Sequence, residues 1–267
     1  MKNHTLYIDA VGIVAPGLEG WNNSIEVIKG NTPFNPTPLP KYKPTLLPPN
    51  ERRRATELVR LAFRCCEDAC ADSNIDLSKA AAVFASSGGD YNIIDSICRT
   101  MKSDDRSVSP TQFHNSVHNS AAGYWSIATG SQACSTSLSA YDWSFSSGLM
   151  EAASFVITEQ QTTLFTCYDI PPPAPLFYSR PITSPFAIAL LLQPEASPDT
   201  FASLTCSLDD TPQVASTCDS AIMEKIRLGN PAAASLPLLE YLANKKEGRC
   251  RLKTYSEQML NIEISIC

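Results

Sequence analysis

The chain has 267 residues, a formal net charge of −6, 43% hydrophobic residues and 18% charged residues, which are proportions typical of globular proteins. Because lysine and arginine form no dense block, we expect no nucleic-acid partner. No apolar run approaches the roughly 18 to 20 residues that span a bilayer, and the N-terminal segment lacks the cleavage site of a secretory signal, so we expect no membrane span.

Strands and helices are predicted to alternate through the first half of the chain. Apolar residues at helical spacing make 51–73 the clearest amphipathic helix, whereas the proline-rich segment 32–50 excludes regular structure. The other predicted elements are a strand at 6–15, a helix at 21–29, a strand at 80–87, a helix ending near 101, an irregular loop at 109–120 and a helix at 119–129.

The second half continues the alternation. Its predicted elements are a strand at 133–141, a sharp turn near Asp142, a helix to 158, strands at 163–168, 185–192 and 200–208, helices at 214–227 and 232–244, and strands at 250–254 and 260–266. The turn-like sequence EASPD suggests that the strands at 185–192 and 200–208 form a hairpin. The alternation predicts a layered α/β fold with a mixed sheet.

Cys134, in the stretch SQACSTSLS, has the appearance of a catalytic nucleophile. A cysteine nucleophile needs a thiolate, which is usually stabilised by a helix N-terminus or by a neighbouring histidine. Cys134 lies near the start of its predicted strand, about eight residues before the turn, and Asp142 is the residue near the turn. A carboxylate can cap the following helix but cannot form a thioester. By position alone, Cys134 is therefore interpreted as a strand residue.

The run FHNSVHNSAAGYWSIATGSQACSTSLSAYDWSFSSGLMEAA, residues 113–153, resembles the N-terminal half of β-ketoacyl synthases of the thiolase fold. YIDAVGIVAPG is similar to the first strand of that family, SSGGD to the glycine turn after its second strand, and SPFAIALLLQ to the strand that opens its second half. The resemblance implies a truncated thiolase-like fold with a mixed five-stranded sheet. It also implies a single domain over 1–267, with an N-terminal half at 1–180 and a reduced C-terminal half at 181–267.

The resemblance places Asp142 where the active family members carry their nucleophilic cysteine. The two catalytic histidines of the family belong to its C-terminal half, and no histidine follows His118 in this chain. A Claisen condensation needs the thiol to hold the acyl chain and the histidines to assist decarboxylation and stabilise the oxyanion. The resemblance therefore implies no catalytic residue. In an alternative register, the string Ala-Cys-Ser-Thr-Ser would place Cys134 at the turn.

A ketosynthase-like protein without its own chemistry can act as one subunit of a two-fold dimer, as chain-length factors do in type II polyketide systems. The VHNSAAG and D-x-S-F-x-x-G-L patterns most resemble the ketosynthase-like subunits of aryl polyene clusters. The implied partners are an active β-ketoacyl synthase and, through the complex, an acyl carrier protein. The implied interface and tunnel residues are Phe113, His114, Asn115, Val117, His118, Ala133, Ser135, Ser137, Ser139 and Tyr141.

The ten cysteines and three histidines show no metal-ligand spacing, and no CxxC pair is present. We therefore expect free thiols in a reducing cytoplasm, no metal and no cofactor. His114 and His118, four residues apart, are interpreted as structural or interface residues. Two rival functions remain open: an active cysteine acyltransferase that uses Cys134, and a scaffold that binds only an acyl carrier protein.

Overall fold

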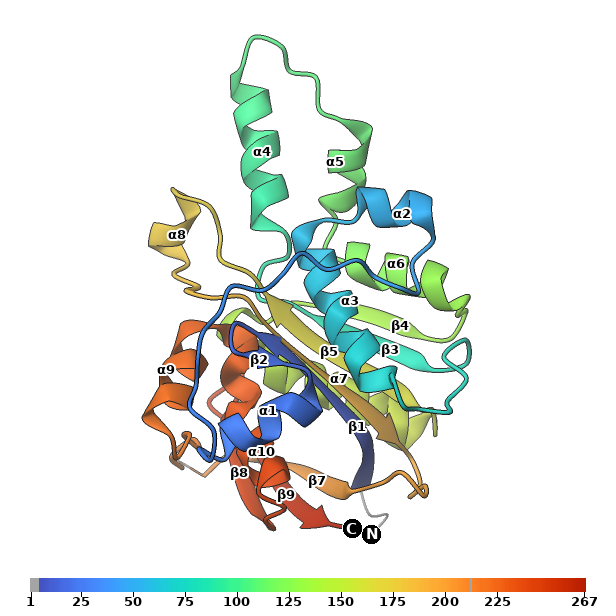
Figure 1. Cartoon of the computed structure of the whole chain (residues 1–267), viewed down its shortest axis with the longest axis vertical. Coiled ribbons are helices and arrows are strands. Elements are labelled where there is room, and N and C mark those ends of the chain that lie inside the picture. Colours follow the sequence, from blue (N-terminus) through green and yellow to red (C-terminus); the bar gives the residue numbers. More distant parts are fainter. Residues whose placement is uncertain (1–4, 212) are drawn as a thin grey trace.

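The computed structural model describes residues 5–211 and 213–267, which form one mixed sheet covered by helices (Figure 1). The strands follow the order β4-β3-β5-β6-β1-β7-β9-β8, and the short β2 pairs with β1. Their bounds are β1 Thr5–Ala15, β2 Leu18–Glu19, β3 Ala81–Ala85, β4 Ser135–Leu138, β5 Thr163–Asp169, β6 Phe186–Gln193, β7 Ala202–Asp209, β8 Gly248–Lys253 and β9 Met259–Ile266. The predicted layered α/β class is confirmed.

The sheet has nine strands, so the expected number of five was too small. Strand β3 pairs in parallel with β4 and β5, and all other pairings are antiparallel. The second half of the chain adds β7, β9 and β8 beyond β1, and this extends the sheet. Strand β4 forms one edge of the sheet and β8 forms the other.

The predicted hairpin between β6 and β7 is wrong, because β1 lies between them. Val11 of β1 is opposite Leu190 of β6, and Leu6 of β1 is opposite Leu204 of β7. The long, largely buried β1 has backbone groups on both edges, and pairing on both sides satisfies them. Two strands that follow each other in sequence are thereby separated.

Helices cover both faces of the sheet. The helices are α1 Trp21–Ile28, α2 Pro49–Arg54, α3 Glu57–Cys70, α4 Tyr91–Lys102, α5 Pro110–Asn115, α6 Ser120–Thr129, α7 Ser144–Thr158, α8 Leu176–Ser179, α9 Ala221–Gly229 and α10 Leu236–Ala243, with 3₁₀ turns η1 Tyr141–Trp143 and η2 Pro231–Ser235. Within the described part of the chain, none of these helices is both long and apolar enough to cross a membrane.

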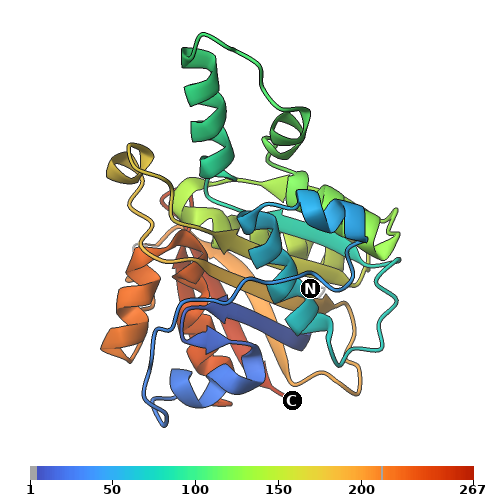
Figure 2. The same cartoon turned by 45° about the horizontal axis from the view of Figure 1, so that its top comes forward.

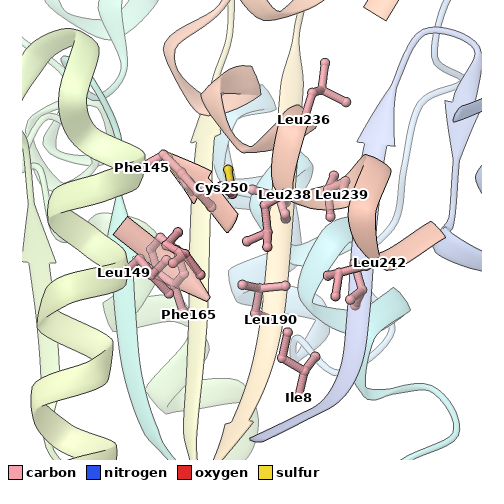
Figure 3. Close-up of a cluster of buried hydrophobic side chains, with 14 of the residues drawn as sticks. Ile8, Phe145, Leu149, Phe165, Leu190, Leu236, Leu238, Leu239, Leu242 and Cys250 are labelled. Carbon is pink, nitrogen blue, oxygen red and sulfur yellow. The ribbon is translucent and has the colours of Figure 1, made fainter. Parts of the chain in front are cut away.

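Alternate strand residues point into two separate cores. On one face, α3 and α6 pack over Phe84 and Leu164, with Phe63 and Trp125 in edge contact. On the opposite face, α7 and α10 bury a larger cluster that includes Phe165 (Figure 3). Burial on both faces explains why the central strands β3, β5 and β6 are nearly continuous hydrophobic runs.

Three predictions of helix or loop differ from the structure in detail. The helix predicted at 214–227 begins only at Ala221 and extends to Gly229. The single helix predicted at 51–73 is divided into α2 and α3, because Ala55 is extended and Thr56 begins a new helix by accepting a hydrogen bond from the Val59 amide (3.3 Å). The loop predicted at 109–120 contains α5, which begins at Pro110. Proline suits the first turn of a helix, where its missing N–H costs no hydrogen bond.

Helices α4 and α5 project together from the body of the molecule (Figures 1 and 2). None of the residues of α4 is fully buried. Exposed apolar side chains on this projection include Ile94, Met101 and Phe113, the last with 68% of its surface exposed. The side chains of this projection therefore lie mostly on the surface, and few of them pack into the hydrophobic core.

Candidate functional site

The chain turns sharply between β4 and α7. Strand β4 ends at Leu138, the 3₁₀ turn η1 follows at Tyr141–Trp143, and α7 begins at Ser144. Tyr141 has a φ angle of 54°, in the left-handed region that aromatic residues rarely occupy. The Ser144 hydroxyl accepts a hydrogen bond from the Ala140 amide (3.0 Å) and donates one to the Tyr141 carbonyl (2.8 Å). This bend, residues 140–144, is thus fixed by its own hydrogen bonds.

Asp142 lies in the bend and pairs with an arginine from another segment. Its carboxylate forms a salt bridge with Arg180, which follows α8. The Arg180 guanidinium also lies over the Tyr141 ring, 3.6 Å from the ring centre. Arg180 is only 9% exposed, whereas the Asp142 side chain is 56% exposed. The side chains at the bend therefore form a stacked ion pair and include no thiol.

Cys134 lies at the opposite end of β4 from the bend. Its side chain is exposed, and its carbonyl accepts a hydrogen bond from the Ala82 amide of β3 (3.0 Å). Cys134 is a free cysteine, and the one histidine side-chain hydrogen bond among the described residues joins His118 to the Ser86 carbonyl. The structure thus places Cys134 before an edge strand, away from the N-terminus of α7.

A buried carboxylate, Asp169, lies at the end of β5. Its Oδ1 accepts hydrogen bonds from the hydroxyls of Ser86 (2.9 Å) and Ser87 (2.8 Å) and from the Ser87 amide (2.9 Å). Burial raises the pKa of Asp169 to about 6, and these hydrogen bonds and the charge of Arg180 oppose that rise. The Asn230 amide donates to the Asp169 carbonyl (3.1 Å), which connects β5 to the second half.

A cavity of about 660 Å³ opens beside the bend, between it and the second half of the chain. Its walls come from the bend, from the segment after α8, from α9 and η2, and from β8. The lining residues are Tyr141, Asp142, Trp143, Ser146, Arg180, Pro181, Ile182, Val214, Ala215, Ser216, Thr217, Arg227, Leu228, Gly229, Asn230, Pro231, Ala234, Arg251, Leu252 and Lys253. We name this space the bend cavity.

The predicted interface residues of β4 and the segment before α6 lie together. His118, Ser135 and Ser137 line a second hollow of about 480 Å³, where the edge strand meets α6. The His118 Nε2 is 3.2 Å from the Ser86 carbonyl. The Ser139 hydroxyl donates to the Ser87 carbonyl (2.9 Å), while Ala133 is half-buried just before β4.

The other predicted interface residues are distributed differently. Phe113 and Val117 are exposed on and after α5, and the His114 ring contacts the Tyr124 ring edge-on with centres 5.9 Å apart. Asn115 is buried, and its amide donates to the carbonyls of Arg54 (3.2 Å) and Thr111 (2.9 Å). Asn115 therefore holds α5 against α2 and offers no surface. Tyr141 lines the bend cavity, apart from the hollow at β4.

Sequence reasoning missed three residues around the bend: Arg180, Asp169 and Asn230. Asp169 is the last residue of β5, which runs parallel to β3, so its carboxylate and Ser86 meet at the carboxyl ends of these two strands. An acidic residue that ends an apolar strand was the available signal for it. No sequence pattern indicated that Arg180, which follows a proline-rich loop, would reach Asp142.

The layered mixed sheet, with a strand that bends into α7 beside a cavity, defines a thiolase-like fold. The family model for the N-terminal domain of β-ketoacyl synthases matches residues 27–256, and the chain therefore belongs to this family. The resemblance predicted from residues 113–153 is confirmed. A search of curated proteins found no match.

Several solved structures are similar over nearly the whole chain. A structure described as the ketosynthase ApeO in complex with its chain length factor ApeC, from Xenorhabdus doucetiae, has 26% identity and a TM-score of 0.70, and the match covers 97% of this chain and 99% of that one. The ishigamide ketosynthase/chain length factor has 12% identity and a TM-score of 0.76, with coverage of 98% and 99%. A type II polyketide acyl-carrier protein complex with its ketosynthase, AntDE:AntF, has 12% identity, a TM-score of 0.74 and full coverage of both chains. The last two show the fold alone.

Proposed function

We propose that this chain is a non-catalytic ketosynthase-like subunit, a chain-length factor, that pairs with an active β-ketoacyl synthase and shapes its acyl tunnel. The observation that carries the proposal is the absence of a thiol at the bend, where Tyr141 and Asp142 stand. The similarity to a ketosynthase in complex with its chain length factor supports this choice of partner.

The residues at the bend do not include the groups that a condensation reaction needs. A carboxylate held by Arg180 cannot carry an acyl chain as a thioester, and no histidine follows His118 to assist decarboxylation. Cys134 is separated from α7 by the length of β4, so its sulfur lacks the stabilisation that a helix N-terminus gives a thiolate. Chain elongation is accordingly assigned to the partner.

Strand β4 offers the surface for pairing, because among the described residues it pairs on one side only, and three of its four residues are small and polar. We infer that the partner's equivalent strand pairs here, and that α5, with Phe113 and Val117, extends the contact. Tyr141, which is 49% exposed, approaches the tunnel. The depth of the tunnel then sets the length of the polyene or polyketide, because its closed end leaves no room for further methylene groups.

The acyl carrier protein delivers chains through the complex, and type II polyketide or aryl polyene synthesis is the setting that we propose. The ten free thiols suit a cytoplasmic location.

Co-expression with an active β-ketoacyl synthase tests the proposal. We expect the two proteins to purify as a heterodimer, and we expect Cys134→Ser to leave the elongation rate of that heterodimer unchanged within about twofold. A loss of elongation of about 100-fold or more in Cys134→Ser would instead identify a catalytic cysteine.

A further inference from the structure

The bend cavity concentrates positive charge in an acidic molecule. Arg180, Arg227, Arg251 and Lys253 line it, whereas the net charge of the chain is −6. Among the lining residues that the structure describes, Asp142 is the one carboxylate. Clefts that collect charge of one sign attract ligands of the other sign.

The Arg180 guanidinium has unused hydrogen-bonding capacity. Its Nη1 is paired with Asp142, but its buried Nε and Nη2 have no hydrogen-bond partner among the described residues. The residue is about nine-tenths buried, with 9% exposure. Buried arginine donors without an acceptor cost free energy, and a bound anion would remove that cost.

Arg251 repeats this pattern, and Arg227 does not. The buried Nε of Arg251 also lacks a partner within the described residues. Arg227 is neutralised by Glu224, which accepts two hydrogen bonds from it, at 2.7 and 2.5 Å. The positive charge that remains for a ligand therefore belongs to Arg180, Arg251 and Lys253.

The rest of the cavity wall is largely apolar. Trp143, Ile182, Leu228, Pro231 and Leu252 contribute to it. The volume of about 660 Å³ falls within the range of small-molecule sites. An apolar wall with arginine donors at one side fits an amphipathic ligand and disfavours a bare inorganic ion.

We propose that the bend cavity binds a small organic anion, with its carboxylate or phosphate head on Arg180 and its apolar body against Trp143 and Leu252. Asp142 acts as an internal competitor, because its half-exposed carboxylate already occupies one end of the same guanidinium. The binding is non-covalent, and it does not depend on the proposed chain-length-factor role.

The test uses the full-length protein, alone or in its heterodimer, titrated calorimetrically with hexanoate, hexyl phosphate and uncharged hexanamide. We expect at least one of the two anions to bind about tenfold or more tightly than hexanamide, and Arg180→Gln to weaken that binding about tenfold. Asp142→Asn should tighten it about three- to tenfold, because it removes the competing charge while keeping a similar shape. A gain of affinity cannot arise from misfolding.

Arg249→Gln is the matched control, because Arg249 lies on the same strand as Arg251 but outside the bend cavity. We expect it to leave anion affinity within about twofold. Equal affinity for hexanoate, hexyl phosphate and hexanamide, no binding of either anion at millimolar concentration, or weaker binding in Asp142→Asn would overturn the proposal. An acyl adduct on Cys134 would refute the proposed function and leave this inference intact.

Discussion

Side chains from separate segments meet at the bend after β4. Arg180 stacks on Tyr141 and pairs with Asp142, although it lies 38 residues further along the chain. In active ketosynthases a free thiol is expected at this place, since a nucleophile must be available to its substrate. Here the carboxylate is engaged with an arginine that is itself nearly buried. At the scale of single residues, the bend therefore carries the Asp142–Arg180 ion pair and the Tyr141 ring in place of a thiol.

The buried carboxylate of Asp169 gives a prediction about pH. Burial raises the pKa of Asp169 to about 6 in the folded chain, whereas its ordinary value is near 4. Between these two pH values the folded chain therefore holds a proton on Asp169 that the unfolded chain has lost. The contribution of Asp169 to the free energy of unfolding is thus full at low pH and is lost as the pH rises through about 6. Relative to Asp169→Asn, which cannot titrate, the wild type should lose about 1 kcal/mol of unfolding free energy between pH 5 and pH 7.

Urea unfolding of both proteins at pH 5, 6 and 7 measures this difference, and the other titrating groups cancel in the comparison. A difference that stays constant across the range, or that changes in the opposite direction, would show that Asp169 is not held in a raised-pKa environment.

At the scale of secondary structure, α7 is pressed closely onto the sheet. A Cβ atom at Gly148 would lie 2.5 Å from Cε2 of Phe165 and 2.9 Å from Cβ of Ala85. The missing side chain lets α7 approach β3 and β5, and this contact supports the larger core (Figure 3). The bend immediately precedes the N-terminus of α7.

Gly148→Ala should therefore destabilise the chain by about 1–3 kcal/mol, because the methyl group overpacks a close-packed core. Gly123→Ala is the matched control: Gly123 lies within α6, and a Cβ there meets nothing within 4 Å. It should stabilise the chain by about 0.5–1 kcal/mol through helix propensity. Thermal or chemical unfolding measures both, and equal effects of the two substitutions would refute the packing argument.

Strand β4 gives a prediction about assembly. The carbonyls of Cys134 and Leu138 accept hydrogen bonds from β3, so the backbone of the residues that alternate with them, including Ser137, faces outward. Ser137→Pro removes an outward N–H group and leaves the pairing with β3 intact. We expect it to weaken the heterodimer at least about tenfold, whereas Ser137→Ala keeps the N–H group and should have little effect.

Analytical ultracentrifugation of the co-purified subunits distinguishes these results. Retention of a stable heterodimer by Ser137→Pro would show that the partner binds elsewhere.

At the scale of the whole molecule, the nine strands form one sheet that joins both halves of the chain. Local sequence was sufficient for most elements of the fold, since β1, β3, β5 and β6 are apolar runs between turns and α3 has its apolar residues at helical spacing. The bend near Asp142 was also predictable, because small and polar residues end β4 before an apolar helix.

Features that depend on contacts distant in sequence could not be predicted. Insertion of β1 between β6 and β7 reflects its need for partners on both edges, which no local pattern encodes. The break at Ala55 depends on one capping threonine, and the meeting of Arg180 with Asp142 depends on how the loop after β5 folds back. The bend cavity is therefore a product of tertiary structure, even though its aspartate was identified in advance.

Peptide mass spectrometry of the heterodimer during turnover tests the central claim most directly. The purified heterodimer is incubated with acyl- and malonyl-loaded carrier protein, quenched and digested, and both subunits are searched for acyl thioesters. We predict acyl groups on the active-site cysteine of the partner and none on any of the ten cysteines of this chain. A stoichiometric acyl thioester on Cys134, formed at the rate of elongation, would contradict the account.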